Sequence, residues 1–256
     1  MHLRTAHPWL KRVLAAGASF LSWAVHATPP VRDVVLVHGA FTDGSSWSTV
    51  ISGLQRDGYR VTAVQNPLTS LADDVAATQR VLARQGGDVV LVGHSWGGAV
   101  VTEAGNAANV KAIVYLSALV PDSGESVATL LKRLDAPMTG MTPDSDGLLW
   151  LTDPDAYRRT MAGDLPKGRV EHLASVAPPI AASAFDDSVS HAAWRDKPAW
   201  YLVTVGDGAL PSNVQRAIAE RIHAQTSSVA SSHLSPVSHP MAVVKLIEKA
   251  ANAVSR

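Results

Sequence analysis

The sequence predicts a single α/β domain with a mostly parallel, doubly wound sheet and a small helical cap. Two observations predict this fold class. Short apolar runs rich in β-branched residues alternate with stretches whose apolar residues recur at helical spacing, and one long interval interrupts the alternation. The length of 256 residues suits one such domain, and an apolar content of 46% is ample for a buried core.

The first 27 residues have the form of a secretory signal. Basic residues precede the apolar run 13–25, and small residues around Ala27 offer a cleavage site. The run is shorter than the ~20 residues that span a bilayer. We therefore expect cleavage after Ala27 and a mature chain, residues 28–256, that has no membrane span and is periplasmic or secreted.

Six apolar runs are the expected strands, and five stretches with helical spacing are the expected helices. The strands are 34–37, 60–64, 89–92, 112–116, 200–205 and 227–230. The helices are 47–57, 71–85, 97–108, 212–224 and 240–254. In open α/β sheets, ligands bind beyond the carboxyl ends of the strands, so the turns after these strands are where functional residues are expected.

Residues 121–198 break this rhythm with prolines, glycines, scattered acids and short amphipathic pieces, where one crossover helix would suffice. Because the interval follows a strand, we expect a helical cap over the ligand-binding edge. Its apolar residues fit either a substrate-cavity lining or the core of the cap, and the sequence leaves both open: Leu148, Leu149, Trp150, Leu151, Ile180 and Phe185.

A nucleophile elbow is predicted at Gly93-His94-Ser95-Trp96-Gly97, because this G-x-S-x-G pattern follows an apolar strand and opens a helix. The glycines allow a tight turn, and the helix N-terminus favours negative charge nearby. Ser95 is therefore the expected nucleophile, with the Trp96 amide as one oxyanion donor.

A second oxyanion donor is expected in the turn that ends the first strand, His38-Gly39-Ala40-Phe41. Its backbone can aim an N–H at the same point as that of Trp96. We favour the Ala40 amide, with Phe41 as the neighbouring alternative. His38, like His94 in the elbow, is expected to support its loop and not to react.

A serine hydroxyl needs a base to remove its proton and a carboxylate to orient that base. With an elbow of this kind the chain order is serine, acid, histidine. Asp207 follows strand 200–205 and His233 follows strand 227–230, so both are expected in turns that face Ser95.

Two rivals are weighed for these roles. Asp122, shortly after strand 112–116, is the alternative acid, and His239 is the alternative base. Because Pro240 suits a first helical turn, His239 is expected at a helix cap instead. The other histidines have no metal-ligand spacing and are expected in surface or core positions: His172, His191 and His223.

Charge and cysteine content exclude several function classes. Lys plus Arg and Asp plus Glu are equal at 22 each, so no net field favours nucleic acid, an anionic membrane or an acidic substrate. The absence of cysteine excludes disulfides, a thiolate nucleophile and a cysteine zinc site. The expected partner is a small, largely uncharged molecule, no cofactor or metal is expected, and the sequence indicates no oligomeric state.

With these motifs, the chain resembles the α/β-hydrolase superfamily from about Val31 to Val254. The segments 38–47 and 115–125 look like the branch that holds plant methyl-ester esterases, hydroxynitrile lyases and bacterial esterases of the pyrethroid-hydrolase type. The resemblance implies an α/β-hydrolase domain whose triad is Ser95, Asp207 and His233, with the Ala40 and Trp96 amides as oxyanion donors. It implies a serine carboxylesterase that cleaves small, largely apolar esters through an acyl-enzyme on Ser95.

Two departures from the family pattern bear on the reaction. Gly208 follows the expected acid, whereas hydroxynitrile lyases carry a lysine close to it, which disfavours lyase activity. Trp96 stands where many relatives have a smaller aliphatic residue, which affects pocket size. Perhydrolysis, carbon–carbon cleavage, lyase chemistry and a small-molecule receptor with an intact triad stay as alternatives.

Overall fold

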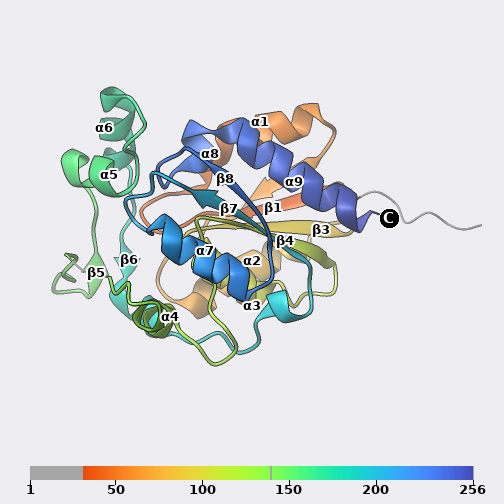
Figure 1. Ribbon diagram of the computed structural model, residues 1–256, viewed down its shortest axis with the longest axis horizontal. Coiled ribbons are helices and arrows are strands. Elements are labelled where there is room, and N and C mark those ends of the chain that lie inside the picture. Colours follow the sequence, from red (N-terminus) through yellow and green to blue (C-terminus); the bar gives the residue numbers. More distant parts are fainter. Residues whose placement is uncertain (1–30, 139, 256) are drawn as a thin grey trace, which may run out of the picture.

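The structure is a computed structural model that describes residues 31–138 and 140–255, so the predicted signal, residues 1–27, lies outside the described residues. It consists of one parallel six-stranded sheet between two helical layers, with a cap at one end (Figure 1). The sheet has the order β2-β1-β3-β4-β7-β8. Its strands are β1 (Asp33–Val37), β2 (Arg60–Ala63), β3 (Val89–His94), β4 (Val110–Leu116), β7 (Ala199–Thr204) and β8 (Gln225–Val229). The predicted fold class is confirmed.

Helices cover both faces of the sheet (Figure 1). One face packs on α1 (Ser48–Arg56) and α9 (Pro240–Val254), and the other on α2 (Leu71–Leu82), α3 (Gly97–Ala104) and α7 (Ser212–Arg221). Successive strand residues point to opposite faces. Val34 and Leu36 therefore pack in the core beneath α1 and α9, while Val35 and Val37 pack in the core beneath α2, α3 and α7. Strands buried on both faces explain the continuous apolar runs.

Three helices end earlier than their apolar spacing predicted. Expected to run to 85, 108 and 224, they end at Leu82, Ala104 and Arg221. The apolar pattern continues past the last turn because Ile222 and Ala224, outside α7, still pack against the core. The apolar spacing reflects which residues are buried, and buried residues continue past the last residue that is hydrogen-bonded as helix.

The segment between β4 and β7 forms the cap. Its elements are α4 (Val127–Arg133), β5 (Leu148–Leu149), α5 (Pro154–Thr160), α6 (Lys167–Ser175), β6 (Ile180–Ala181), and the 3₁₀ turns η2 (Ala182–Asp186) and η3 (Ala193–Arg195). The cap is not wholly helical, because β5 and β6 pair as a short antiparallel ladder. In Figure 1, α5 and α6 extend beyond the sheet on the side opposite the C-terminus.

The apolar residues of the cap divide between its core and a cavity. Leu149 and Ile180 are buried in the cap core, while Leu151 and Phe185 line the cavity described below. Both expectations were wrong for Trp150, which is 49% exposed and whose indole N–H donates to Asp144 at 2.7 Å. The hydrogen bond at one end of the indole explains how an apolar side chain stays at the surface.

The strand order creates a crevice beside β1. β1 lies between β2 and β3 in the sheet. The connection from β1 runs through α1 to β2 on one side, and the chain then returns through α2, on the other face, to β3 on the other side, so the strand order reverses between β1 and β3. Ligands bind at such switch points, beyond the carboxyl ends of the strands. Within residues 31–255, every helix is too short or too polar to cross a membrane.

Candidate active site

Ser95 sits in a strained turn between β3 and α3. Its φ is +52°, in the left-handed region that non-glycine residues rarely occupy. The backbone holds it there, since its N–H donates to Leu116 at 3.1 Å and its carbonyl accepts from Gly98 at 2.8 Å. His94 and Trp96 on either side are buried, whereas Ser95 itself is half-buried. The turn thus presents one side chain at the crevice.

The glycines around Ser95 are required by close packing of backbone on backbone. A Cβ on Gly93 would lie 2.6 Å from the Gly97 carbonyl oxygen, and one on Gly97 would lie 2.5 Å from that of Val37. Neither neighbour can move without displacing a strand or the helix. These contacts bring the helix N-terminus against β1, beside the turn that follows it.

Gly97→Ala is expected to lower the free energy of unfolding by about 1–3 kcal/mol, because an added Cβ overpacks a rigid backbone contact. Urea unfolding measures this. Gly86→Ala is the control, since a Cβ there meets nothing within 4 Å. Equal stability of the two variants would show that the helix N-terminus is less tightly packed than the structure has it.

Asp207 and His233 contact each other at the carboxyl ends of β7 and β8. The Asp207 Oδ2 lies 2.7 Å from the His233 Nδ1, and the two side chains are 0% and 2% exposed. A carboxylate only accepts hydrogen bonds, so the Nδ1 carries the proton and donates it. The Nε2 lone pair is then free to accept a proton from the cavity side.

Four further donors surround the Asp207 carboxylate. Thr204 Oγ1 and Gln215 Nε2 donate to Oδ2 at 2.7 and 2.9 Å, and the amides of Ala209 and Leu210 donate to Oδ1 at 2.8 Å. Burial opposes the charge, but His233 and these donors hold the pKa of Asp207 below its usual value. Asp207 therefore stays ionised at neutral pH. Sequence reasoning missed Gln215, whose buried amide lies on an otherwise ordinary amphipathic helix.

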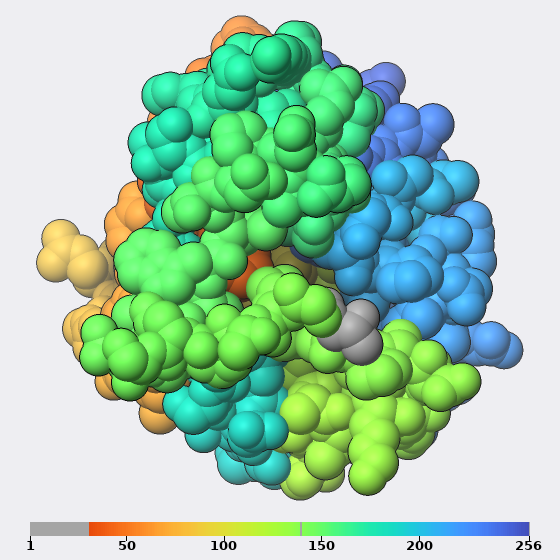
Figure 2. All heavy atoms as spheres, turned by 90° about the vertical axis from the view of Figure 1, so that its left-hand side faces the viewer, coloured from red at the N-terminus to blue at the C-terminus, as the bar shows by residue number. Residues whose placement is uncertain are grey.

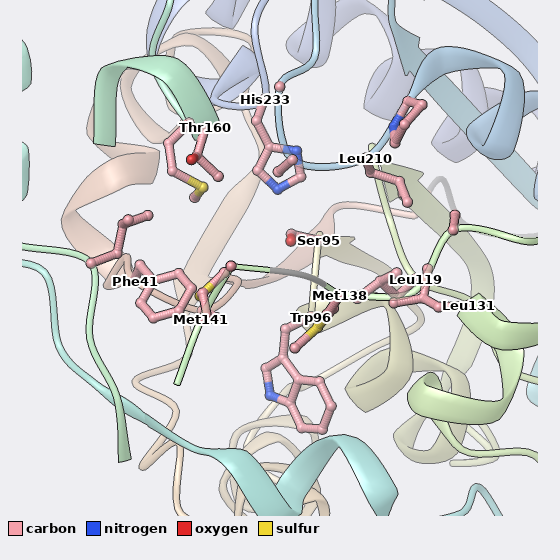
Figure 3. A pocket seen from close by; sticks show the side chains of 18 of the residues that line it. Phe41, Ser95, Trp96, Leu119, Leu131, Met138, Met141, Thr160, Leu210 and His233 are labelled. Atoms are coloured by element: carbon pink, nitrogen blue, oxygen red, sulfur yellow. The ribbon is translucent and has the colours of Figure 1, made fainter. Parts of the chain in front are cut away.

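Ser95 and His233 face the same cavity. In Figure 3 the His233 imidazole lies over Ser95, with a ring nitrogen pointing toward the serine side chain. The structure thus brings together Ser95, Asp207 and His233 from the ends of β3, β7 and β8.

His94 supports the loop of His233. Its Nε2 donates to the His233 carbonyl at 2.9 Å, and the two ring centroids are 4.8 Å apart. Burial, with His233 nearby, lowers the pKa of His94 to about 3. His94 is therefore neutral and serves as a hydrogen-bond donor, in line with the supporting role expected of it.

His38 fixes the turn after β1 in a similar way. Its Nδ1 donates to the Gly39 carbonyl, and its Nε2 accepts from the Asn66 N–H, both at 2.9 Å. Burial lowers the pKa of His38, so this neutral tautomer persists. Asn66 also donates from its side chain to the His38 carbonyl at 2.9 Å. The Gly39 Cα lies so close to the elbow that a Cβ would be 2.7 Å from the Ser95 Cβ.

The amide N–H groups of Ala40, Phe41 and Trp96 all belong to residues that line the cavity. Among the residues with described structure, none of the three donates a hydrogen bond. Phe41 has φ +58°, and its carbonyl accepts from the hydroxyl of Tyr157, in cap helix α5, at 3.1 Å. Both Ala40 and Phe41 stay available as the second oxyanion donor beside Trp96.

The cavity has a volume of about 490 Å³ and lies between the cap and the carboxyl edge of the sheet. Figure 2 shows a hollow framed by the cap and the segment around α7, with the segment near residue 40 visible at its base. Most lining side chains are apolar, among them Phe41, Leu131, Met141, Leu151 and Phe185. Ser95 and Thr160 supply the hydroxyls among the described lining residues, and Arg159 supplies a permanent charge.

Trp96 forms one wall of the cavity and is held by a buried acid. Its indole N–H donates to Asp74 Oδ2 at 2.7 Å, and its ring lies 5.0 Å from that of Phe185. Burial raises the pKa of Asp74, although hydrogen bonds from Trp96 and the Leu68 amide oppose this. Nothing in the sequence pattern connected Asp74 with Trp96.

The rival residues lie elsewhere. Asp122, which is itself buried, accepts from the exposed Arg195 and Arg221 at 2.6 and 2.7 Å in an ion-pair cluster. Burial works against its charge, but the two guanidinium groups hold the pKa of Asp122 below its usual value. His239 lies between α8 (Ser235–Ser238) and α9, at the N-cap of α9, which is the helix-cap position expected of it. Its Nδ1 lies 3.6 Å from Asp164 Oδ2 of the cap. Within the described ranges, no three His, Cys, Asp or Glu side chains are grouped to hold a metal ion.

Comparisons with known proteins agree with this architecture. The model of the alpha/beta hydrolase family matches residues 34–246. An alpha/beta hydrolase of Aspergillus novofumigatus is 26% identical over 244 residues, covering 85% of this chain and 96% of the relative. A carbendazim-hydrolysing esterase of Nocardioides sp. is 32% identical over 117 residues, covering 40% of this chain and 48% of the esterase.

Solved structures show the same fold. A pyrethroid hydrolase from Sphingobium faniae superimposes with a TM-score of 0.72 at 22% identity, covering 87% of this chain and 98% of the hydrolase. The family match spans most of the chain, including the elbow and the turns of Asp207 and His233. The chain therefore belongs to the alpha/beta hydrolase family.

Proposed function

We propose that this chain is a serine carboxylesterase that hydrolyses small, largely apolar carboxylic esters through an acyl-enzyme on Ser95. The observation that supports this most is the buried Asp207–His233 pair, whose imidazole lies over Ser95 in a mostly apolar cavity of about 490 Å³. A cavity of this size and polarity suits an uncharged ester of moderate length.

In the proposed mechanism, His233 Nε2 accepts the Ser95 hydroxyl proton while Oγ attacks the ester carbonyl carbon. The carbonyl oxygen becomes an oxyanion, which the amides of Trp96 and Ala40 bind. The imidazolium then gives its proton to the departing alkoxide, which leaves Ser95 acylated. Asp207 stabilises the imidazolium and keeps its own charge throughout.

Deacylation repeats these steps with water. His233 removes a proton from water, the hydroxide attacks the acyl carbon, and the second oxyanion forms in the same place. Collapse releases the acid and returns the proton to Ser95. The reaction needs no group beyond those of the chain and water.

Two observations favour hydrolysis of esters over the alternative reactions. Relatives include a carbendazim-hydrolysing esterase and a pyrethroid hydrolase. A Cβ on Gly208 would clash with the Arg159 carbonyl oxygen, so no lysine fits at the position after Asp207. Lyase chemistry that depends on a lysine there is disfavoured.

Trp96→Leu is expected to shift the preferred acyl chain to a greater length, because the indole fills space beside Phe185. Each additional methylene buried is worth about 1 kcal/mol, so the octanoate-to-acetate ratio of kcat/KM should rise about tenfold or more. Trp96→Phe is the control, since it removes the N–H to Asp74 but keeps most of the ring volume. An unchanged ratio in Trp96→Leu would mean that acyl chains occupy another part of the cavity.

The experiment that tests the proposed function is hydrolysis of p-nitrophenyl esters from acetate to palmitate by residues 28–256, beside labelling with a serine-directed fluorophosphonate. We expect steady turnover, fastest with short to medium chains, and a single label on Ser95. Labelling without steady turnover would indicate a receptor or another substrate class. The absence of both turnover and labelling would contradict the mechanism.

We also propose that the chain is exported, with cleavage after Ala27. The basic residues and apolar run before this position support the proposal. Mass spectrometry of the protein from the periplasm of a Gram-negative host should give a chain that starts at Thr28. A full-length chain retained in the cytoplasm would contradict it.

A further inference from the structure

The loop that carries His233 is tied to the cap on both sides of the histidine. After it, the Leu234 N–H donates to the Met161 carbonyl at 3.1 Å. Before it, the Ser232 N–H donates to Asp164 Oδ2 at 3.0 Å, and the Ser232 hydroxyl donates to Asp164 Oδ1. Met161 and Asp164 lie in the turn that follows α5, so one cap turn holds both neighbours of His233.

Asp164 is well suited to hold this loop. Its side chain is only 26% exposed. Burial opposes its charge, but hydrogen bonds from Ser232 and Ser238 keep the pKa of Asp164 below its usual value, so it is an acceptor at neutral pH. Charged acceptors make stronger hydrogen bonds than neutral ones.

The opposite side of the His233 backbone is held by the sheet edge. The His233 carbonyl accepts from His94 Nε2 at 2.9 Å and from Ser117 Oγ at 3.2 Å. These two contacts fix the carbonyl group of His233. Without Asp164, the N–H of Ser232, a residue only 4% exposed, would lose its partner, and the loop would have to move to satisfy it.

The same cap turn also contributes to the cavity, since Thr160 and Met161 line it. In Figure 3, Thr160 lies beside His233 at the cavity wall. The turn therefore contacts the space for substrate with one part and the His233 loop with another.

We propose that Asp164 is a positioning residue, which acts through Ser232 to hold the His233 imidazole over Ser95. The cap then sets the place of the general base as well as the shape of the cavity. This inference rests on the proposed function of Ser95 and His233. Asp164 itself does not line the cavity among the described residues and takes no part in the bond changes.

The central test compares Asp164→Ala with the wild type on the p-nitrophenyl ester that the wild type cleaves fastest. If the His233 imidazole is displaced, proton transfer from Ser95 in the transition state becomes less favourable, while the apolar side chains that bind the substrate stay in place. We expect kcat to fall on the order of 10- to 100-fold and KM to change less than about threefold. Asp164→Asn should recover part of the loss, because its amide oxygen keeps one acceptor for Ser232.

Asp153→Ala is the matched control. Asp153 is also an acid of the cap. It caps the N-terminus of α5, the helix that precedes the turn of Asp164, by accepting from the Ala156 N–H at 2.7 Å. Its removal weakens α5 without touching the His233 loop, so kcat should stay within about threefold. If Asp153→Ala loses as much kcat as Asp164→Ala, cap stability and not positioning is responsible, and the proposal is wrong.

A double variant tests the path through Ser232. Ser232→Ala should lose less kcat than Asp164→Ala, because its N–H still reaches the carboxylate. Asp164→Ala combined with Ser232→Ala should be no slower than Asp164→Ala alone, since the two residues act as one unit. Additive losses would show that Asp164 acts by another route.

Proton NMR gives a readout that does not depend on finding the substrate. The His233 Nδ1 proton, shared with Asp207, should give a far-downfield resonance that shifts or broadens in Asp164→Ala but not in Asp153→Ala. An unchanged resonance with unchanged kcat overturns the inference. Failure of the proposed function is seen separately, as a wild type that neither cleaves esters nor takes the fluorophosphonate label.

Discussion

Ser95→Ala is expected to lower kcat for ester hydrolysis by about 10⁵–10⁶-fold, the loss typical when a triad nucleophile is removed. The proposed mechanism gives His233 one hydroxyl to deprotonate, that of Ser95 in the left-handed turn. Water would have to replace it and attack the ester directly, without the acyl-enzyme. Single-turnover assays with an activated ester measure the residual rate.

Thr160→Val is the matched control for this prediction. Thr160 carries the other hydroxyl of the described cavity lining, and valine keeps its shape. Turnover should stay within about tenfold of the wild type, since no developing charge is assigned to that hydroxyl. A large loss in Thr160→Val with an active Ser95→Ala would place the nucleophile on the cap.

Activity and stability should separate at Ser95. Alanine keeps the Cβ at φ +52° and loses no hydrogen bond that the backbone makes there. Glycine removes the left-handed strain, which is worth about 1 kcal/mol. We therefore expect Ser95→Ala to unfold at nearly the wild-type urea concentration and Ser95→Gly at the same or a higher one, while both are inactive.

The parts of the fold that the sequence predicted are those set by short-range patterns. Short strand-like runs located the six strands of the sheet. Burial on both faces explains the continuous apolar runs of β1, β3, β4 and β7, whereas the edge strand β2 is half-buried and the edge strand β8 is largely exposed. The elbow was visible because strand, glycine turn and helix are contiguous in the chain, so the geometry of Ser95 is encoded within a few residues.

The supporting contacts were not visible, because they join distant segments through single side chains. Asp74 and Trp96 are 22 positions apart, and Asp164 and Ser232 are 68 apart. In the sequence both aspartates resemble surface acids, although the fold buries Asp74 and covers most of the Asp164 side chain. Trp150 shows the reverse error, because apolarity alone does not say which face of a short cap segment turns inward.

Asp207→Asn is expected to lower kcat by about 10⁴-fold while the fold stays intact. The carboxylate accepts on Oδ2 from His233, Thr204 and Gln215, and on Oδ1 from the amides of Ala209 and Leu210. An asparagine can keep its oxygen toward the two amides only by turning its NH₂ toward His233.

That orientation reverses the hydrogen bond to the imidazole. The NH₂ of the introduced asparagine would donate to His233 Nδ1, which must then accept, and the ring proton would move to Nε2. Nε2 would face Ser95 with a proton in place of a lone pair and could not act as base. The charge that stabilises the imidazolium would also be gone.

Asp122→Asn is the matched control, since Asp122 is the other acid that the sequence offered for this role. It is buried and pairs with Arg195 and Arg221 away from the cavity, so its substitution should change ester turnover by less than about threefold, whereas the loss of a buried charge partner should lower the free energy of unfolding. Steady-state kinetics of both variants decide between the two acids. Because Asp207 and Asp122 lose the same charge in these variants, a loss confined to Asp207→Asn follows from its contact with His233 and not from net charge. A loss confined to Asp122→Asn would move the acid to the other cluster and leave His233 without the partner proposed for it.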